Sequence, residues 1–413
     1  MKITSIILSS MLILCVSLNT AAGGDWLKWR GPYGTGISNE TNWNSEALKK
    51  EVKIIWDAKV GKGHSAAVIQ GDYVYTMGNK MVASGGDTTL VDVVCCLKVE
   101  NGKQVWSYSY PCEQGLDPGP GSTPVIDGSS LYTLSREGHL TCFNAKNGIV
   151  NWQRNIVSDS LTKRHEWGFS SSPVIVENLL LLNINKSGIA LNKNSGQLVW
   201  NSEAEESWYA TPVLFNYNGK ETAAISTQRS VVACDVQTGN VLWTYRWEGR
   251  CSDPIPFDNK MLLTGTGSEL LEITDTEPKS LWKNRRVNGS FQSWVVVDGY
   301  AYGFGQDRRQ EPIQCIDMKN GEVKWSKNLC FAGSLIAAND KLIIVSRDGN
   351  LIIAKACPDS YKEISSASIV PMADNTGVHN RRQCHCWINP VLANGRIYLR
   401  NTYGNLVCVD ISQ

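Results

Sequence analysis

Residues 95–106 read CCLKVENGKQVW and carry a pattern that recurs along the chain. Its counterparts are CFNAKNGIVNW at 142–152, ALNKNSGQLVW at 190–200, CDVQTGNVLW at 234–243, EITDTEPKSLW at 272–282 and CIDMKNGEVKW at 315–325. Most have the form Cys or small residue, x, Asp or Asn, then Gly-x-x-x-Trp. The closing tryptophans recur every 39 to 48 residues. A period of about 40–50 residues is typical of propellers and solenoids.

Each repeat predicts four short strands. After the tryptophan comes a variable loop and then an apolar run introduced by a small residue and often proline, as in STPVIDGSSLYTL at 122–134. A turn and a third strand lead to the Cys-x-Asp position, and the glycine turn joins that strand to the one bearing tryptophan. Strands separated by Asp-Gly, Asn-Gly and Ser-Gly turns favour antiparallel hairpins.

The two ends of the chain complement each other. VKIIWDAKV at 52–60 is an outer strand with no inner strands before it, whereas residues 387–412 supply three strands with no outer strand after them. Residues 351–364 form a degenerate repeat that has lost its tryptophan. We therefore predict an all-β, eight-bladed β-propeller of four-stranded antiparallel blades. The N-terminal strand closes the ring by pairing with the C-terminal blade, which removes exposed edges.

The N-terminus predicts export. Residues 1–22 combine Lys2, an apolar stretch and small residues up to Ala22, which is typical of a cleaved signal peptide. Ile13 and Leu14 before Cys15 do not favour lipidation. We expect a leader at 23–50 and the propeller at 51–413, with no transmembrane segment. The protein is then periplasmic or secreted, and we expect a monomer.

The net charge of the chain limits the classes of partner that we expect. A formal net charge of +1 over 413 residues provides no field for nucleic acid. Envelope proteins, peptides or glycans remain as partners.

The repeated residues are interpreted as structural. We expect the tryptophans to pack over glycine turns between blades: Trp106, Trp152, Trp200, Trp243, Trp282 and Trp325. Cys96 and its counterparts, which alternate with Ala190, fit small apolar core positions. Cys95 and Cys96 are too close for an unstrained disulfide, because adjacent Cα atoms lie about 3.8 Å apart. The CHC stretch at 384–386 lacks patterned partners, so no metal site is predicted.

One mouth of the channel is the candidate ligand site. It is formed by the loops that precede the innermost strands and by the turns between the middle strands of each blade. These segments carry His64, Arg136, Arg164, Trp167, Trp208, Gln228, Arg229, Gln292, Trp294, Arg347, Arg382 and Arg400. Arginine can clamp carboxylates, and tryptophan can stack on a flat ring or a sugar. The alternative is an ordinary solvated polar rim.

The Gly-x-x-x-Trp repeat over roughly residues 50–413 resembles the pyrroloquinoline-quinone (PQQ) repeat. That resemblance implies either a non-enzymatic propeller, similar to the propeller subunit of the outer-membrane barrel-assembly machinery, or a quinoprotein alcohol dehydrogenase. The mouth carboxylates are scattered singly, and no CxxCH haem motif is present. We therefore expect a binding or assembly scaffold with no catalytic residues and no cofactor. A dehydrogenase using PQQ and a divalent cation, or a carbohydrate-binding module, is the alternative.

Overall fold

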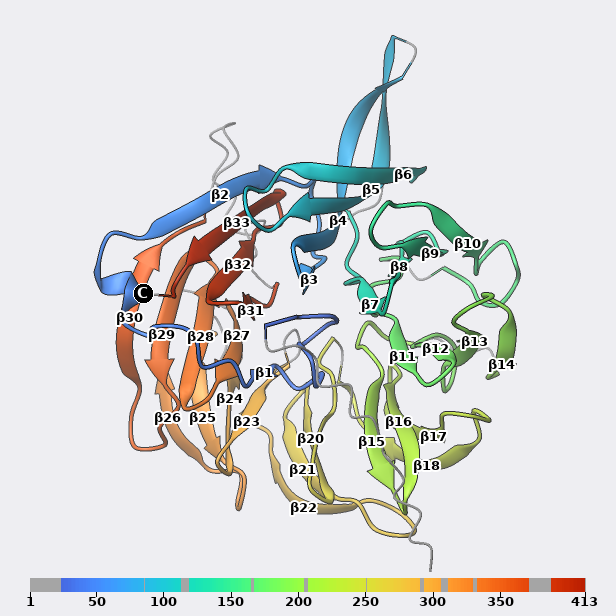
Figure 1. The fold of residues 1–413 in the computed structure, drawn as a ribbon. Coiled ribbons are helices and arrows are strands. Elements are labelled where there is room, and N and C mark those ends of the chain that lie inside the picture. The colour runs from blue at the N-terminus through green and yellow to red at the C-terminus, as the bar shows by residue number, and fades with distance from the viewer. Residues whose placement is uncertain are drawn as a thin grey trace, which may run out of the picture.

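The computed structural model describes residues 24–84, 86–112, 119–164, 167–203, 207–249, 251–289, 293–305, 311–329, 333–370 and 388–412. In these residues the chain forms eight sheets around a centre, each with four antiparallel strands, and one sheet gains a parallel fifth strand from the leader; this confirms the predicted eight-bladed propeller (Figure 1). The described part of the chain contains no helix with the length and apolarity needed to span a membrane. Its one helical element is the short 3-10 helix η1 (Ala47–Lys49).

The blades are named A to H in chain order, and their strands run from the centre outward. Blade A has β3 (Val68–Gln70), β4 (Tyr73–Ser84), β5 (Asp87–Lys98) and β6 (Gln104–Pro111). Blade B has β7 (Val125–Asp127), β8 (Ser130–Leu134), β9 (His139–Asn144) and β10 (Val150–Asn155). Blade C has β11 (Val174–Val176), β12 (Leu179–Leu182), β13 (Ile189–Asn192) and β14 (Leu198–Asn201). Blade D has β15 (Val213–Tyr217), β16 (Lys220–Ser226), β17 (Ser230–Asp235) and β18 (Val241–Arg246).

The second half repeats this order. Blade E has β19 (Ile255–Phe257), β20 (Lys260–Thr264), β21 (Ser268–Glu272) and β22 (Lys279–Asn284). Blade F has β23 (Val295–Val297), β24 (Tyr300–Phe304), β25 (Ile313–Asp317) and β26 (Val323–Lys327). Blade G has β27 (Gly333–Ala338), β28 (Lys341–Ser346), β29 (Asn350–Lys355) and β30 (Lys362–Ser368). Blade H has β31 (Val391–Ala393), β32 (Arg396–Arg400), β33 (Asn405–Asp410) and, as its outer strand, β2 (Lys53–Lys59).

The ring closes between the two ends of the chain, as predicted. Strand β2 pairs antiparallel with β33, and Trp56 lies opposite Cys408. The Lys53 ammonium reaches the Asp410 carboxylate across the same pair of strands at 2.8 Å. The N-terminal strand therefore completes the four-stranded blade H.

Five of the outer-strand tryptophans pack on a glycine turn of the following blade: Trp56, Trp106, Trp152, Trp200 and Trp282. A Cβ atom on Gly148 would lie 2.6 Å from the Trp106 ring, and one on Gly196 would lie 2.7 Å from Trp152. The indole N–H groups donate to backbone carbonyls at these turns. The bonds run from Trp56 to Val99 (2.8 Å), Trp106 to Ala145 (2.9 Å), Trp152 to Lys193 (2.8 Å), Trp200 to Val236 (2.9 Å), Trp282 to Met318 (2.8 Å) and Trp325 to Cys357 (2.8 Å). These six tryptophans therefore link neighbouring blades by packing and by a hydrogen bond.

Trp243 is different from the other tryptophans of the motif. It is buried, and among the described residues its Nε1 has no hydrogen-bond partner. The next repeat reads EITDTEPKSLW and lacks the glycine of the other turns. The packing position is thus kept at this site, but the hydrogen bond between blades is not.

The repeat cysteines lie in layers with tyrosine and tryptophan. Cys96 is paired across the sheet with Tyr75 on one side and Trp106 on the other. The same arrangement joins Tyr132, Cys142 and Trp152. Cys95 and Cys96 are both free and buried, and successive residues of β5 point to opposite faces. These cysteines fill core positions.

Candidate functional site

A belt of hydrogen bonds runs from blade A to blade F at the entrances to the innermost strands. In each step a backbone N–H donates to the side-chain oxygen of the equivalent residue in the next blade. The bonds join Ala66 to Thr123 (3.0 Å), Thr123 to Ser172 (3.0 Å), Ser172 to Thr211 (3.1 Å), Thr211 to Asp253 (2.8 Å) and Asp253 to Ser293 (3.0 Å). This belt explains the small polar residue that introduces each apolar run, because only a short side chain spans neighbouring blades.

Asp253 is the one carboxylate in the described part of this belt, and it binds the N-terminal leader. Its Oδ2 accepts hydrogen bonds from Trp29 Nε1 at 2.8 Å and from Ser293 Oγ at 2.9 Å. Arg30 Nη1 lies 3.8 Å from the same oxygen, and both side chains of this ion pair are 2% exposed. Burial lowers the pKa of the Arg30 guanidinium, and the Asp253 charge opposes that shift.

The leader crosses the centre of the ring (Figure 1). Trp26 exchanges backbone hydrogen bonds with Ile69 of blade A at 2.8 and 2.9 Å. Further along, β1 (Ile37–Ser38) pairs in parallel with the innermost strand of blade G. Near its end, Glu40 accepts backbone hydrogen bonds from Asn394 and Gly395 of blade H. The leader thus bridges blades that are far apart in the chain.

The two faces of the propeller therefore differ. We call the side with the turns between first and second strands, including Gly71 and Gly395, the closed face. The leader enters there: the Asp25 carboxylate accepts from the Gly71 N–H, and Glu40 holds Gly395. The opposite side, with the loops that precede the innermost strands, is the mouth. A ligand approaching the mouth meets the centre already occupied by buried Arg30.

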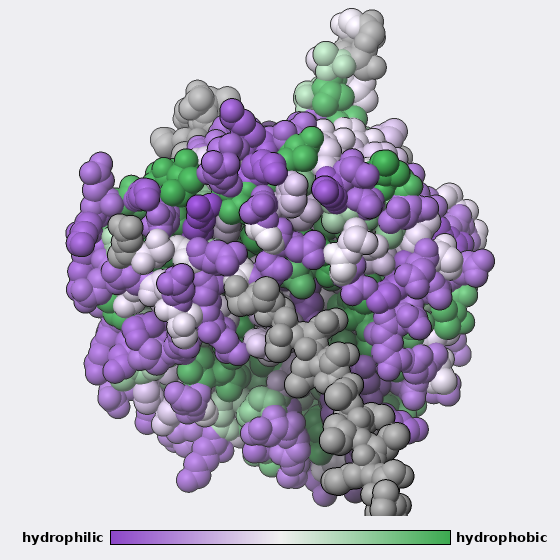
Figure 2. All heavy atoms as spheres, in the orientation of Figure 1, coloured by the Kyte–Doolittle hydropathy of each residue, from purple (hydrophilic) through white to green (hydrophobic). Residues whose placement is uncertain are grey.

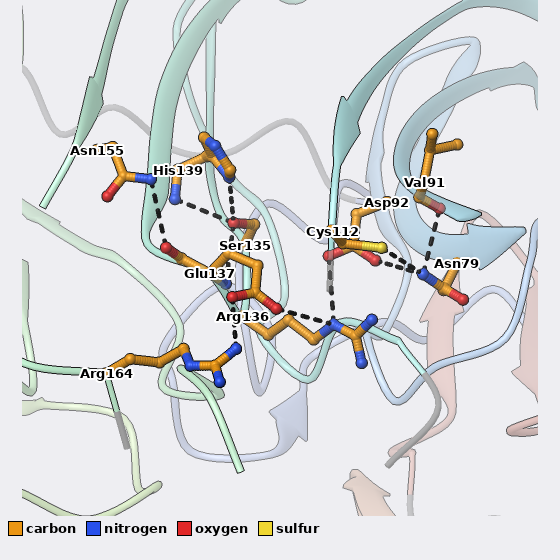
Figure 3. A network of polar contacts seen from close by, with 10 residues as sticks. All are labelled: Asn79, Val91, Asp92, Cys112, Ser135, Arg136, Glu137, His139, Asn155 and Arg164. Carbon is orange, nitrogen blue, oxygen red and sulfur yellow. Dashed lines mark hydrogen bonds and ion pairs between the residues drawn. The ribbon is translucent and has the colours of Figure 1, made fainter. Parts of the chain in front are cut away.

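A polar network lies at the mouth between blades A and B (Figure 3). Asp92 is fully buried; its Oδ1 accepts from Asn79 Nδ2 at 2.8 Å, and its Oδ2 lies 3.7 Å from Arg136 Nε. Arg136 also lies 3.8 Å from Glu137, which binds the exposed Arg164 at 2.6 Å. Charges therefore alternate along the mouth wall from the interior to the solvent.

Burial shifts the pKa of two groups in this network, Asp92 and His139. Burial raises the pKa of the Asp92 carboxyl, while the hydrogen bond from Asn79 and the charge of Arg136 act in the opposite direction. The pKa of His139 is lowered by burial, against the attraction of Glu137 and Asp92. The His139 ring stacks on Tyr110 with centroids 5.1 Å apart. Each acid of this network therefore has an arginine partner.

The structure describes ten of the twelve residues predicted for the mouth. Gln292 and Arg382 lie outside the described residues, as do the predicted signal peptide at 1–22 and the CHC stretch at 384–386. Arg164, Arg229 and Trp167 are exposed, with Trp167 at 47%. His64, Trp208, Gln228 and Arg347 are half-buried. Of these residues, Arg136 and Arg164 are brought together through Glu137, and Trp208 packs on Tyr209 with centroids 5.2 Å apart.

Three of the predicted residues are buried: Arg136 in the mouth network, and Trp294 and Arg400 in the interior. Trp294 is fully buried in the core between blades, and a Cβ on Gly303 would lie 2.2 Å from its ring. Arg400 is also buried; it donates to Thr76 Oγ1 at 2.7 Å and to the Gly61 carbonyl at 2.8 Å. Burial lowers the pKa of Arg400 to about 10. Arg400 therefore ties blade H to blade A.

Sequence reasoning did not recognise the roles of Asp253 and Asp92. Asp253 stands before a proline in SDPIPF, where other repeats have STP, SSP or ATP, so aligning those tripeptides could have singled it out. Asp92 carried no such signal, because β5 is longer than the equivalent strands and its register with Asn79 depends on the folded sheet.

The fold and the repeat define the class of PQQ-repeat propellers. A family profile described as outer membrane protein assembly factor BamB matches residues 40–203, 91–327 and 227–413, and the chain belongs to this family. It is 19% identical over 314 residues to outer membrane protein assembly factor BamB of Yersinia pestis, covering 73% of this chain and 67% of the relative. It is 22% identical to polyvinylalcohol dehydrogenase of a Sphingopyxis strain over 55% of this chain, which spans only 35% of that enzyme.

Solved structures share the fold. BamB from Moraxella catarrhalis superimposes with a TM-score of 0.62 and 15% identity, over 87% of this chain and 99% of that one. Quinohemoprotein alcohol dehydrogenase from Comamonas testosteroni gives a TM-score of 0.70 and 12% identity, over 95% and 82%. At these identities the likeness concerns the fold alone, so function rests on the site.

Proposed function

We propose that this protein is an exported β-propeller that binds a protein partner of the cell envelope at its mouth and acts as an assembly scaffold. The observation that carries the proposal is the asymmetry of the ring. The leader fills the centre from the closed face, with Arg30 held by Asp253. The mouth keeps charged and aromatic side chains, including Arg164 and Trp167, open to solvent. Exposed side chains around a centre that the leader already occupies suit a macromolecule better than a small substrate, which would need a deep pocket.

A photocrosslinking amino acid at position 167 tests this proposal. Cells carrying the substitution at Trp167 are irradiated, and covalent adducts of the full-length protein are identified by mass spectrometry. Ile149 is the matched control, because it is 62% exposed but lies beside the outer strand of blade B. We expect adducts with an envelope protein at 167 and none at 149. Equal adducts at both positions, or adducts only at 149, would overturn the assignment of the mouth.

A PQQ-dependent dehydrogenase is supported less well by the described residues. In quinone chemistry of this kind a divalent cation needs oxygen ligands. Asp92, Glu137 and Asp253 each already face an arginine at 3.7–3.8 Å or less. No group of three or more His, Cys, Asp or Glu suited to a metal ion occurs within the described ranges. These ion pairs favour the scaffold over a PQQ–metal site among the described residues.

Absorbance distinguishes the two functions. Purified protein is incubated with PQQ and Ca²⁺, washed by gel filtration and assayed for quinone absorbance and for dye-linked alcohol oxidation. We expect neither signal. Retained quinone together with dye reduction would replace the scaffold proposal. A glycan partner is tested in parallel by an array, where saturable binding that is lost in Trp167→Ala would favour a carbohydrate-binding module.

A further inference from the structure

Blade A carries a β-arm that the other blades lack. Strands β4 and β5 have 12 residues each. The equivalent middle strands of blades B to H have four to seven. The extra length projects from the ring as a two-stranded ribbon (Figure 1). We define the arm as residues 80–84 and 86–90.

Both edges of the arm are unpaired in the described part of the chain. On the outer side, β6 pairs with β5 only as far as Val91, which lies opposite Pro111. Proline has no N–H to donate and cannot continue the ladder. On the side of the channel, β3 pairs with β4 only up to Tyr75, and the next contact is a bridge from Lys62 to Asn79.

That bridge fixes which backbone groups face outward. Lys62 and Asn79 exchange both hydrogen bonds, at 2.7 and 2.8 Å, so the N–H and C=O of Asn79 point away from β5. Backbone groups alternate in direction along an antiparallel strand. Met81 and Ala83 therefore present their N–H and C=O groups on the channel side of the arm, in line with Lys62.

The arm carries little of the protection that natural edge strands have. Proline, clustered charge and bulges usually prevent unwanted pairing. Between residues 80 and 90 the charged residues are Lys80 and Asp87, and there is no proline. Met81 is 54% exposed, and hydrophobic atoms lie along the arm in Figure 2. A two-stranded ribbon of this kind is only marginally stable without a further strand.

We propose that the channel-side edge of the arm, at Met81 and Ala83, binds an extended strand of a partner protein by β-sheet addition. The strand continues the line of Lys62 and lies over the mouth, and its backbone pairs with β4 over about 16 Å, the length of five strand residues. Backbone pairing selects extended segments with little regard for side chains. This binding mode rests on the proposed function and specifies that the bound segment of the partner protein is an extended strand.

A second copy of this chain is the less favourable occupant. Two arms paired along five residues bury far less than the roughly 1,000 Å² of total area that a specific interface needs. A partner that also contacts the mouth wall, next to buried Asn79 and Asp92, has more surface available.

Peptide binding tests the edge directly. The probe is a fluorescent peptide of alternating valine and threonine flanked by lysines, titrated into the full mature protein by fluorescence anisotropy. The same peptide with N-methylated backbone amides at alternate positions keeps the side chains but loses edge hydrogen bonds. We expect it to bind about tenfold or more weakly, as for two lost backbone hydrogen bonds.

Two proline variants identify the edge. Ala83→Pro removes an N–H from the channel side, whereas Thr88→Pro, its cross-strand neighbour, removes one from the outer side. We expect Ala83→Pro to weaken peptide binding about tenfold and Thr88→Pro to leave it unchanged, with equal melting temperatures for both.

Three results would overturn the inference. The first is equal affinity for the methylated and unmethylated peptides. The second is that Thr88→Pro weakens peptide binding as much as Ala83→Pro does. The third is a wild-type dimer in sedimentation that Ala83→Pro dissociates. Crosslinking from position 167 tests the proposed function separately. Adducts there combined with failed peptide binding would reject the arm and keep the scaffold.

Discussion

Replacing the repeat tryptophans by phenylalanine separates their packing from their hydrogen bonds. In Trp200→Phe the indole N–H that donates to the Val236 carbonyl at 2.9 Å is lost, and a carbonyl of a buried residue is left without this donor. In Trp243→Phe no hydrogen bond is lost, because the Nε1 of this buried ring has no partner among the described residues. Both variants lose similar ring area, so their difference reports the hydrogen bond.

The magnitude follows from the two local environments. Loss of a typical hydrogen bond costs about 1 kcal/mol, and a buried donor left unsatisfied costs about 1–3 kcal/mol. Trp200→Phe loses a hydrogen bond and is destabilised by its contribution. Trp243→Phe instead removes a buried N–H that has no partner among the described residues, which relieves the cost of leaving it unsatisfied. We expect Trp200→Phe to be less stable than Trp243→Phe by about 2–4 kcal/mol, which for a chain of this length corresponds to about 2–5 °C in Tm.

Thermal and urea denaturation of the two purified variants, followed by tryptophan fluorescence and circular dichroism, measure this difference. Trp152→Phe is a replicate of the bonded type, since Trp152 donates to Lys193 at 2.8 Å. The reasoning is refuted if Trp243→Phe is destabilised as much as Trp200→Phe and Trp152→Phe, because packing alone would then explain the motif.

Three further variants probe the closure of the ring. Asp253→Asn leaves the buried Arg30 without its anionic partner and is expected to lower the free energy of unfolding by about 3 kcal/mol, measured by urea titration. Gly148→Ala adds a Cβ 2.6 Å from the Trp106 ring at a φ of 73°, so we expect a loss of about 2–4 kcal/mol in the same assay. The hydrogen bonds from Lys53 and Ser412 lower the pKa of Asp410 to about 2. Because the unfolded carboxyl titrates near about 3.9, its stabilisation is complete above about pH 5 and is lost as the pH falls toward 2. Asp410→Asn should therefore make the fall of Tm with pH shallower over this range. We expect a contribution below about 1 kcal/mol, because the Lys53 partner is largely exposed.

Matched variants control these predictions. Arg30→Met combined with Asp253→Ser should recover part of the loss of Asp253→Asn, because serine keeps the belt and no charge is left buried. Gly128→Ala also changes a glycine of positive φ, but nothing lies within 4 Å of the added Cβ, so it should cost only about 1–2 kcal/mol. If Gly128→Ala is as harmful as Gly148→Ala, backbone conformation rather than the tryptophan contact is responsible. An unchanged slope in Asp410→Asn would assign the acid sensitivity to other carboxyls.

The sequence by itself determined the number of blades, the closing strand and the packing positions. These features repeat, and a repeated strand or turn leaves the same local signal each time it occurs. Trp56 opposite Cys408 could be predicted because each end of the chain lacked what the other supplied. Cys96 could be assigned to the core because Ala190 stands at the same position in a later repeat.

Tertiary structure decided the site, because its residues do not repeat. Arg30 of the leader meets Asp253 across 223 positions of sequence, and nothing in the local pattern of either residue records that contact. Trp294 and Arg400 looked like rim residues from their loop positions, but they are buried because neighbouring blades leave room for them. The sequence also contains the additional residues of the β-arm. Its unpaired edges, however, follow from the positions at which β3 and β6 stop pairing with β4 and β5. A repeat specifies the ring locally, whereas a channel lies between blades and depends on how the whole ring closes.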